Sequence, residues 1–339
     1  MNEIDGSYLE GGGQIIRTTI ALSAITRTPV HLYNIRAGRE KPGLRPQHIE
    51  GIKAAAQMCT ADVSGLDPGS TEIHFTPQAL HGGDFVIDIK TAGSVTLVMQ
   101  TLIPVALHTT EPVHIIVRGG TAVPFSPTSE YFEHVLLTFL ARMGIEMRVT
   151  TKKHGFYPAG GGEISVSIQP GAMRSLDLVE RGSLERIEVV SVAHVDLRHA
   201  RVAERMLAGF KNIIPEIETQ YRYVKAASVG CFISSRALFQ NSSIGADELG
   251  RRGRRAEDVG KDAATALQRA ISGEGAIDRW MVDQIIPFVA LAARATGRGS
   301  NIKIPELSNH ARTNMWVVSS FLQVGFRAEN NILECYLKE

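Results

Sequence analysis

The chain has 339 residues, of which 44% are hydrophobic and 21% are charged, and its formal net charge is +1. This composition is ordinary for a globular protein with an ample buried core, and the near-zero charge gives no global sign of a nucleic-acid-binding protein. Three cysteines without a CxxC spacing argue against a disulfide framework and against structural zinc. No apolar run reaches the roughly 18 residues of a membrane span, and no charged-then-apolar leader precedes Asp5, so we expect a cytoplasmic protein without a membrane segment.

One pattern of strand, Gly-rich loop, helix, strand and helix occurs three times along the chain. Apolar residues recur at three- and four-residue spacing, as at Ile16 and Ile20, and this periodicity predicts helices. The predicted helix pairs are 14–26 with 47–59, 94–108 with 131–144, and 276–293 with 311–325. Alternating segments predict strands at 71–76, 163–168 and 332–337. The sequence therefore predicts an α/β fold with three repeated units of two helices on a sheet.

The repeat is interrupted between the second and third units. The interrupting segment has its own alternation, with strands predicted at 187–195 and 227–235 and helices at 201–214 and 256–272. These elements suffice for a small α/β domain inserted into the larger one. We expect a large domain formed by 1–180 and 274–339, with an inserted domain at 181–273.

The first candidate site lies at the start of the first helix, in the sequence EGGGQIIR. Glycines before a helix let backbone N–H groups approach an anion, and the helix N-terminus favours negative charge. Glu10 lies beside this turn and Arg17 follows one turn into the helix, so a phosphate with a magnesium ion is one interpretation. The alternative is a tight turn without a ligand. The Walker A pattern GxxxxGK[ST] is absent from the sequence, which excludes a P-loop.

Two basic clusters are candidates for phosphate binding. Arg36 and Arg39 lie three residues apart in a loop stiffened by prolines, and guanidinium groups suit phosphate oxygens. A surface loop with chance basic residues is the alternative. The second cluster, 251–255 (RRGRR), either extends a track for RNA or forms a solvated face.

Two further motifs lie near the C-terminus. Trp280 and Asp283 share one helical face, where they could stack on a base and accept a hydrogen bond, although such a tryptophan is more often part of the core. His310 lies in SNHARTN, with Ser308 or Asn309 as the helix cap. A neutral imidazole can attack phosphorus, but a histidine at a helix start is more often a polar surface residue. The spacing does not choose between these interpretations.

Six segments, taken in order, resemble the RNA 3′-terminal phosphate cyclase family over essentially the whole chain. They are EGGGQIIR, IRAGR with GLRPQH, TAGSVTLVMQ, GGT with a following SP, HGFYPAGGGE, and H-x-x-TN. The resemblance implies an enzyme that uses ATP to convert an RNA 3′-terminal phosphate into a 2′,3′-cyclic phosphodiester, through a covalent histidine–AMP and an RNA-adenylate. It also implies three units of two helices on a four-stranded sheet, with an inserted small α/β domain.

The resemblance assigns roles residue by residue. His310 corresponds to the nucleophile, and Glu10 to a ligand of Mg²⁺ or Mn²⁺. The ATP-binding positions are Arg17, Gln100, Pro127, Trp280, Met281, Val282, Asp283 and Gln284. The positions for the RNA 3′-phosphate are Arg36, Arg39 and Gln47. The implied partner is an RNA with a 3′-terminal phosphate, and no obligate protein partner is implied.

Three departures and two alternatives accompany the resemblance. Trp280 stands where many members have tyrosine, and Ala122 replaces a polar residue common at its position. In GLRPQH, Arg45 stands as in one branch of the family and is displaced in another. One alternative is a non-catalytic relative that acts in ribosomal-RNA processing, but such relatives lose the nucleophile motif that this chain retains at His310. The other is a carboxyvinyl transferase on a similar repeated fold, which the segments HGFYPAGGGE and H-x-x-TN disfavour.

Overall fold

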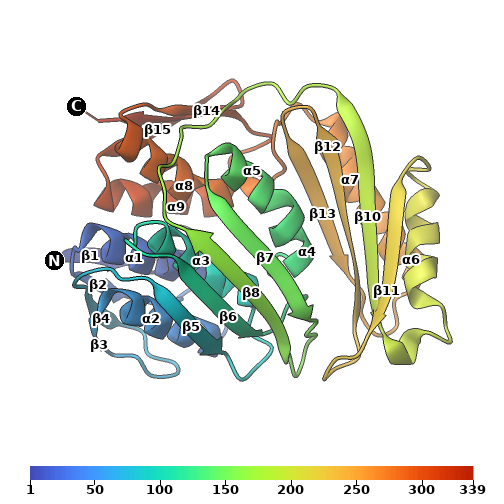
Figure 1. Ribbon diagram of the computed structural model, residues 1–339, viewed down its shortest axis with the longest axis horizontal. Helices are drawn as coiled ribbons and strands as arrows, with labels where there is room; N and C mark the ends of the chain where they lie inside the picture. Colours follow the sequence, from blue (N-terminus) through green and yellow to red (C-terminus); the bar gives the residue numbers. More distant parts are fainter. Residues whose placement is uncertain (339) are drawn as a thin grey trace.

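The structure is a computed structural model, and residues 1–338 of it are described (Figure 1). Its strands form four four-stranded sheets, ordered β1-β2-β4-β3, β5-β6-β8-β7, β15-β16-β14-β9 and β11-β10-β12-β13. The predicted α/β class is confirmed.

The strands of the first two sheets are β1 (Asn2–Asp5), β2 (Val30–Tyr33), β3 (Asp62–Ser64), β4 (Ile73–Thr76), β5 (Gly83–Asp88), β6 (Val113–Gly119), β7 (Glu146–Lys153) and β8 (Gly162–Gln169). Those of the other two are β9 (Asp177–Leu178), β10 (Leu184–His194), β11 (Glu218–Val224), β12 (Cys231–Phe239), β13 (Ser243–Leu249), β14 (Ser300–Lys303), β15 (Val324–Glu329) and β16 (Ile332–Leu337). The helices are α1 (Gly13–Thr26), α2 (Pro46–Cys59), α3 (Val95–Ala106), α4 (Ser129–Tyr131), the π-helical η1 (Phe132–Leu136), α5 (Leu137–Arg142), the 3₁₀ turn η2 (Val195–Leu197), α6 (Val202–Lys211), α7 (Ala256–Ser272), α8 (Met281–Thr296) and α9 (Asn309–Phe321).

Three of the sheets share one topology. In each, the first two strands along the chain are parallel and the remaining two are antiparallel to their neighbours. The parallel connection carries the first helix of the unit, which is α1, α3 or α8, and the next connection carries the second, which is α2, the α4–α5 segment or α9. The predicted threefold repeat of two helices on a sheet is thereby confirmed.

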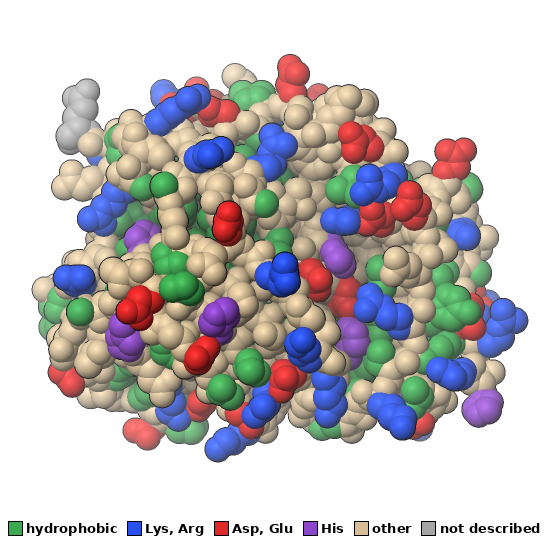
Figure 2. Space-filling view, in the orientation of Figure 1, with side chains coloured by type: hydrophobic (Ala, Val, Ile, Leu, Met, Phe, Trp, Pro, Cys, Tyr) green, Lys and Arg blue, Asp and Glu red, His purple; other side chains and the backbone are tan. Residues whose placement is uncertain are grey.

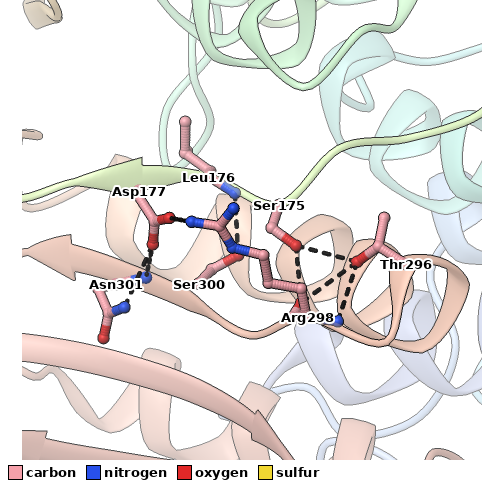
Figure 3. A network of polar contacts seen from close by, with 7 residues as sticks. All are labelled: Ser175, Leu176, Asp177, Thr296, Arg298, Ser300 and Asn301. Carbon is pink, nitrogen blue, oxygen red and sulfur yellow. Dashed lines mark hydrogen bonds and ion pairs between the residues drawn. The ribbon is translucent and has the colours of Figure 1, made fainter.

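The third unit begins earlier in the chain than the sequence predicted. Strand β9 precedes the inserted residues and pairs in parallel with β14, so the insertion interrupts the third unit itself. Polar contacts hold this junction (Figure 3): Arg298 is 2.6 Å from Asp177, and the backbone N–H of Leu176 donates to Ser300 Oγ at 3.0 Å. A two-residue strand is too short to show alternation, and for this reason the sequence did not reveal it.

The apolar core explains why the three units stay together. Helix α1 packs against α3 and α9, and α8 packs against α9, so helices from all three units meet at the centre. Their inward side chains, among them Ile15, Ile20 and Ile285, are fully buried. A separate cluster lies between the β10–β13 sheet and helices α6 and α7, on the right of Figure 1. The division into domains at 181 and 273 stays a prediction, and the separate core supports it.

Most of the predicted helices start or end a few residues from their predicted bounds, and side-chain caps explain two of these differences. Helix α8 begins at Met281 rather than at 276, because the side chain of Asp278 accepts hydrogen bonds from the backbone of Trp280 and Met281. Helix α9 begins at Asn309 after Ser308, whose hydroxyl accepts from the backbone N–H of Ala311 at 3.1 Å. Of the two candidate caps, Ser308 is therefore the one used.

The surface is mixed in charge. On the face shown in Figure 2, basic and acidic side chains are interspersed over most of the area, in keeping with the near-zero net charge. Within residues 1–338, the helices lack the combination of length and apolar character that crossing a membrane requires.

Candidate active site

A cavity of about 370 Å³ brings together most of the residues that the sequence singled out. It is lined by Gln14, Arg17, Leu97, Gln100, Phe125, Ser126, Pro127, Thr128, Tyr131, Asp247, Glu248, Leu249, Trp280, Asp283, Gln284 and His310. Helices α1, α3, α8 and α9 contribute through their N-terminal turns, and α4 contributes through its cap. Because a helix N-terminus carries partial positive charge, this convergence favours an anionic ligand. A larger cavity of about 740 Å³ between η1 and the β10–β12 sheet contains none of the predicted site residues.

The imidazole of His310 is fixed by a hydrogen bond. Its Nδ1 lies 2.7 Å from Gln14 Oε1, and since an amide oxygen accepts, Nδ1 carries the proton. Burial lowers the pKa of His310 below its ordinary value, with Arg17 and Arg39 acting in the same direction and Glu10 opposing them. The ring is therefore neutral near pH 7, with the lone pair on Nε2.

Glu10 connects this histidine to the basic loop. Glu10 Oε1 accepts from Arg39 Nη2 at 2.7 Å and lies 3.3 Å from His310 Nε2. The sequence had assigned Glu10 to a metal ion and Arg39 to RNA, and the structure places both groups next to the histidine. Neither residue lines the 370 Å³ cavity, so they lie at its edge, beyond His310.

Arg17 and Asp283 form the charged part of the cavity. The Arg17 side chain is half-buried, and its Nε is fully buried and has no hydrogen-bond partner within residues 1–338. Burial lowers the pKa of Arg17 to about 10, against the effect of Asp283, and burial raises the pKa of Asp283 to about 6, against the effect of Arg17. A buried N–H group without a hydrogen-bond partner is costly, so the site suits an anionic ligand that would accept from Arg17.

The remaining predicted nucleotide positions divide into two groups. Trp280 is 55% exposed and lines the cavity with Pro127, so it is not a core residue. Gln100 donates to Gln284 Oε1 at 3.2 Å, and Gln284 in turn donates to the backbone of Trp280. The side chains of Met281 and Val282 are fully buried in the core, so any contact of theirs with a nucleotide is limited to the backbone.

The predicted RNA-phosphate residues lie outside the cavity. Arg36 Nη1 donates to the carbonyls of Lys41 and Gly43, both at 2.8 Å, and thereby holds its own loop. Gln47 Oε1 accepts from the backbone N–H of Ser94 at 2.8 Å. Of the two arginines, Arg39 is the one whose guanidinium contacts Glu10, the residue next to His310.

The sequence did not single out several of the residues that form the site. Gln14 orients the histidine, and its place just after three glycines in the first turn of α1 could have revealed it. Phe125 is fully exposed with a φ of 64°, a conformation uncommon for a bulky residue. Asp247 comes from the inserted segment and Tyr131 from α4, and no local pattern indicates that they approach the nucleotide positions.

A family model for RNA 3′-terminal phosphate cyclase matches residues 8–328. The chain belongs to the RNA 3′-terminal phosphate cyclase family. An RNA 3′-terminal phosphate cyclase from Methanosarcina barkeri is 42% identical over 334 residues, covering 97% of both chains. Cyclases from Ignicoccus hospitalis and Thermococcus kodakarensis are 43% and 40% identical over 332 and 336 residues; they cover 95% and 97% of this chain, and 93% and 95% of their own lengths. The resemblance seen in the sequence, and with it the predicted enzyme class, is confirmed.

One solved structure, the enolpyruvyl transferase NikO from Streptomyces tendae, covers 99% of this chain and 65% of its own. Its TM-score is 0.29 and its sequence identity is 10%. At these values it supports no argument about the function of this cyclase-family chain.

Proposed function

We propose that this member of the RNA 3′-terminal phosphate cyclase family uses ATP to convert an RNA 3′-phosphate into a 2′,3′-cyclic phosphodiester, through a covalent His310–AMP. The observation that carries the proposal is the hydrogen bond that fixes the His310 imidazole to Gln14, in a cavity that is also lined by Arg17, whose Nε has no hydrogen-bond partner within residues 1–338. Nucleotidyl transfer requires an oriented nucleophile next to a site that binds the phosphates of the substrate.

In the first step, His310 Nε2 attacks the α-phosphorus of ATP. A P–N bond forms, the bond to the bridging oxygen breaks, and pyrophosphate leaves from the opposite side. The proton on Nδ1 stays in its hydrogen bond to Gln14, so the lone pair on Nε2 is available for attack. Arg17 and the converging helix N-termini neutralise charge that develops on the phosphoryl oxygens.

The residues fit a divalent ion that arrives with the nucleotide. No group of three or more His, Cys, Asp or Glu side chains suited to a metal ion occurs within residues 1–338. Mg²⁺ is commonly held by one or two carboxylates together with substrate phosphates, and Glu10 can supply such a carboxylate. In that position Mg²⁺ or Mn²⁺ would neutralise charge on the leaving pyrophosphate. Glu10 has a cationic partner in Arg39 at 2.7 Å, and this pairing with positive charge supports the assignment.

In the second step, an oxygen of the RNA 3′-phosphate attacks the same phosphorus, and the P–N bond to His310 breaks. In-line attack must come from the side opposite Nε2, which is where pyrophosphate left. We expect Arg39 to hold that phosphate, with Arg36 and Gln47 supporting the adjacent segment. In the third step, the RNA 2′-hydroxyl attacks the activated phosphate and AMP leaves, which closes the cyclic diester.

Incubation with α-labelled ATP and divalent metal, without RNA, tests this function. Label should become attached to the protein in an acid-labile bond, and a chase with RNA bearing a 3′-phosphate should release AMP and yield cyclic ends. Absence of labelling would refute the mechanism and favour a non-catalytic member that acts in ribosomal-RNA processing. A cytoplasmic location stays a prediction alongside this function.

Adenylylation should be lost in acid. His310 must be neutral and Asp283 must be ionised, and each active form is present above its pKa and lost below it. The pKa of His310 is lowered from its ordinary value, and that of Asp283 is raised to about 6. We therefore expect a constant rate of enzyme–AMP formation above pH 7 and a fall through about pH 6, measured by quenched labelling between pH 5 and 8. A rate that stays constant down to pH 5 would contradict the requirement for ionised Asp283.

Trp280 should stack on the adenine. Arg279 Cζ lies 4.6 Å from the centre of the indole ring and covers one face, which leaves the other for a base. Base stacking is worth about 1–3 kcal/mol, so Trp280→Ala should raise the ATP concentration for half-maximal labelling roughly ten- to hundredfold. Trp280→Tyr should be tolerated because phenol also presents a flat face. An unchanged ATP requirement in the alanine variant would show that Trp280 makes no contact with the base.

A further inference from the structure

The carboxylate of Asp278 joins three parts of the protein at the wall of the cavity. Its Oδ1 accepts from the hydroxyl of Tyr131 at 2.8 Å and from the backbone N–H groups of Trp280 and Met281 at 2.9 and 3.0 Å. Its Oδ2 accepts from the backbone N–H of Gly245 at 3.0 Å. The side chain is 2% exposed, so these four donors replace its hydration. One buried carboxylate thereby connects α4, strand β13 and the start of α8.

Strand β13 makes a second link to the same wall. Asp247 Oδ2 accepts from the backbone N–H and the hydroxyl of Thr128 at 3.0 and 2.6 Å, directly after Pro127. Gly245 and Asp247 are two residues apart and so lie on the same side of the strand. Asp247, with the two residues that follow it in β13, also lines the cavity. The inserted segment therefore forms one wall of the nucleotide cavity, and Asp278 joins that wall to the start of α8, directly after Trp280.

We propose that Asp278 is a positioning residue for the nucleotide, which sets the indole of Trp280 at a fixed distance from the wall formed by β13. A helix cap alone accounts for the bonds to the backbone of Trp280 and Met281. The bonds to Gly245 and Tyr131 add nothing to a cap, and they fix where the cap lies relative to the rest of the cavity. This inference rests on the proposed function, because it takes the ligand of the cavity to be ATP.

The test measures nucleotide binding without chemistry. The chain has two tryptophans, so in a Trp316→Phe background the fluorescence reports on Trp280. Titration with α,β-methylene-ATP, which cannot lose pyrophosphate, gives the dissociation constant. Asp278→Ala should weaken binding about tenfold or more, since hydrogen bonds to a buried carboxylate are lost. Asp278→Asn keeps an acceptor for the cap and places an amide N–H against Gly245, so it should fold and still bind several-fold more weakly.

A control separates this role from general loosening of the inserted segment. Arg181 donates to the carbonyls of Ile271 and Gly275 at 2.6 and 3.2 Å, where the chain enters and leaves that segment, and it does not line the cavity. Arg181→Met should therefore bind as tightly as the parent, with thermal unfolding used to confirm that every variant is folded. If Asp278→Asn binds α,β-methylene-ATP as tightly as the parent, Asp278 acts only as a helix cap. If Arg181→Met loses as much affinity as the Asp278 variants, the cause is general loosening of the inserted segment. Either result overturns the inference. Failure of the Trp316→Phe parent itself to bind the nucleotide would instead overturn the proposed function.

Discussion

His310→Ala should abolish covalent labelling by α-labelled ATP while leaving the protein folded. Removal of a nucleophile removes the step itself, so we expect the rate of enzyme–AMP formation to fall by a factor on the order of 10⁴ or more. The side chain lies in the first turn of α9, whose cap is made by Ser308, so the helix start does not depend on the imidazole. Labelling measured over time, with circular dichroism as a check on folding, gives the result.

His114→Ala is a matched control for this change. His114 is exposed on β6, where its Nδ1 contacts Ser167 Oγ at 3.0 Å, away from the cavity. This variant should label at the parental rate. Full labelling of His310→Ala would show that the nucleophile is another residue.

The Arg36→Ala/Arg39→Ala double variant should form enzyme–AMP and then transfer AMP poorly to RNA with a 3′-phosphate. Hydrogen bonds to charged groups contribute about 1.5–3 kcal/mol each, so losing two of them should slow transfer by about 100-fold or more. Arg39 reaches Glu10 and His310 in the structure, whereas Arg36 holds the carbonyls of its own loop. We therefore expect Arg39→Ala alone to show most of the effect.

A two-stage time course distinguishes this role from binding of the ATP triphosphate. Enzyme–AMP is formed first without RNA, and RNA 3′-phosphate is then added while transfer is followed. Arg142→Ala, at an exposed arginine on α5, controls for the loss of a positive charge. A slow first stage combined with normal transfer from preformed enzyme–AMP would place these arginines on ATP instead.

The sequence predicted the parts of the fold that depend on local periodicity. Helix α7 was predicted at 256–272 and strand β16 at 332–337, and both occur with those bounds, because each has a strong one-sided pattern over several turns or alternations. Strand β9 has two residues and no such pattern. Its existence depends on β14, more than 120 residues later, so no local reading of the chain could find it.

For the candidate site, the resemblance and the residue chemistry indicated the residues but not their partners. His310, Trp280 and Arg17 do line one cavity, and they were found from the resemblance and from residue chemistry. The contact of Glu10 with Arg39 and the bond from His310 to Gln14 join residues that are 29 and 296 positions apart. Such contacts follow from the packing of α1 against α9 and of the loop beside them, which a pattern along the chain does not specify.

The position of the inserted segment has a consequence for a nascent chain. Asp177 is synthesised 124 residues before Asn301, its hydrogen-bond partner in the third sheet. Pairing at such a separation is slow when a long flexible loop must close first. Strands β10–β13 and helices α6 and α7 pack among themselves, so the intervening residues can acquire structure while the C-terminus is still being made. Once they have done so, Arg181 and Gly275 are joined at 3.2 Å, and the remaining loop between β9 and α8 is only a few residues long on each side. The folded insertion thereby holds β9 close to the start of α8, so that β14 pairs with β9 after closure of a short loop rather than a long one.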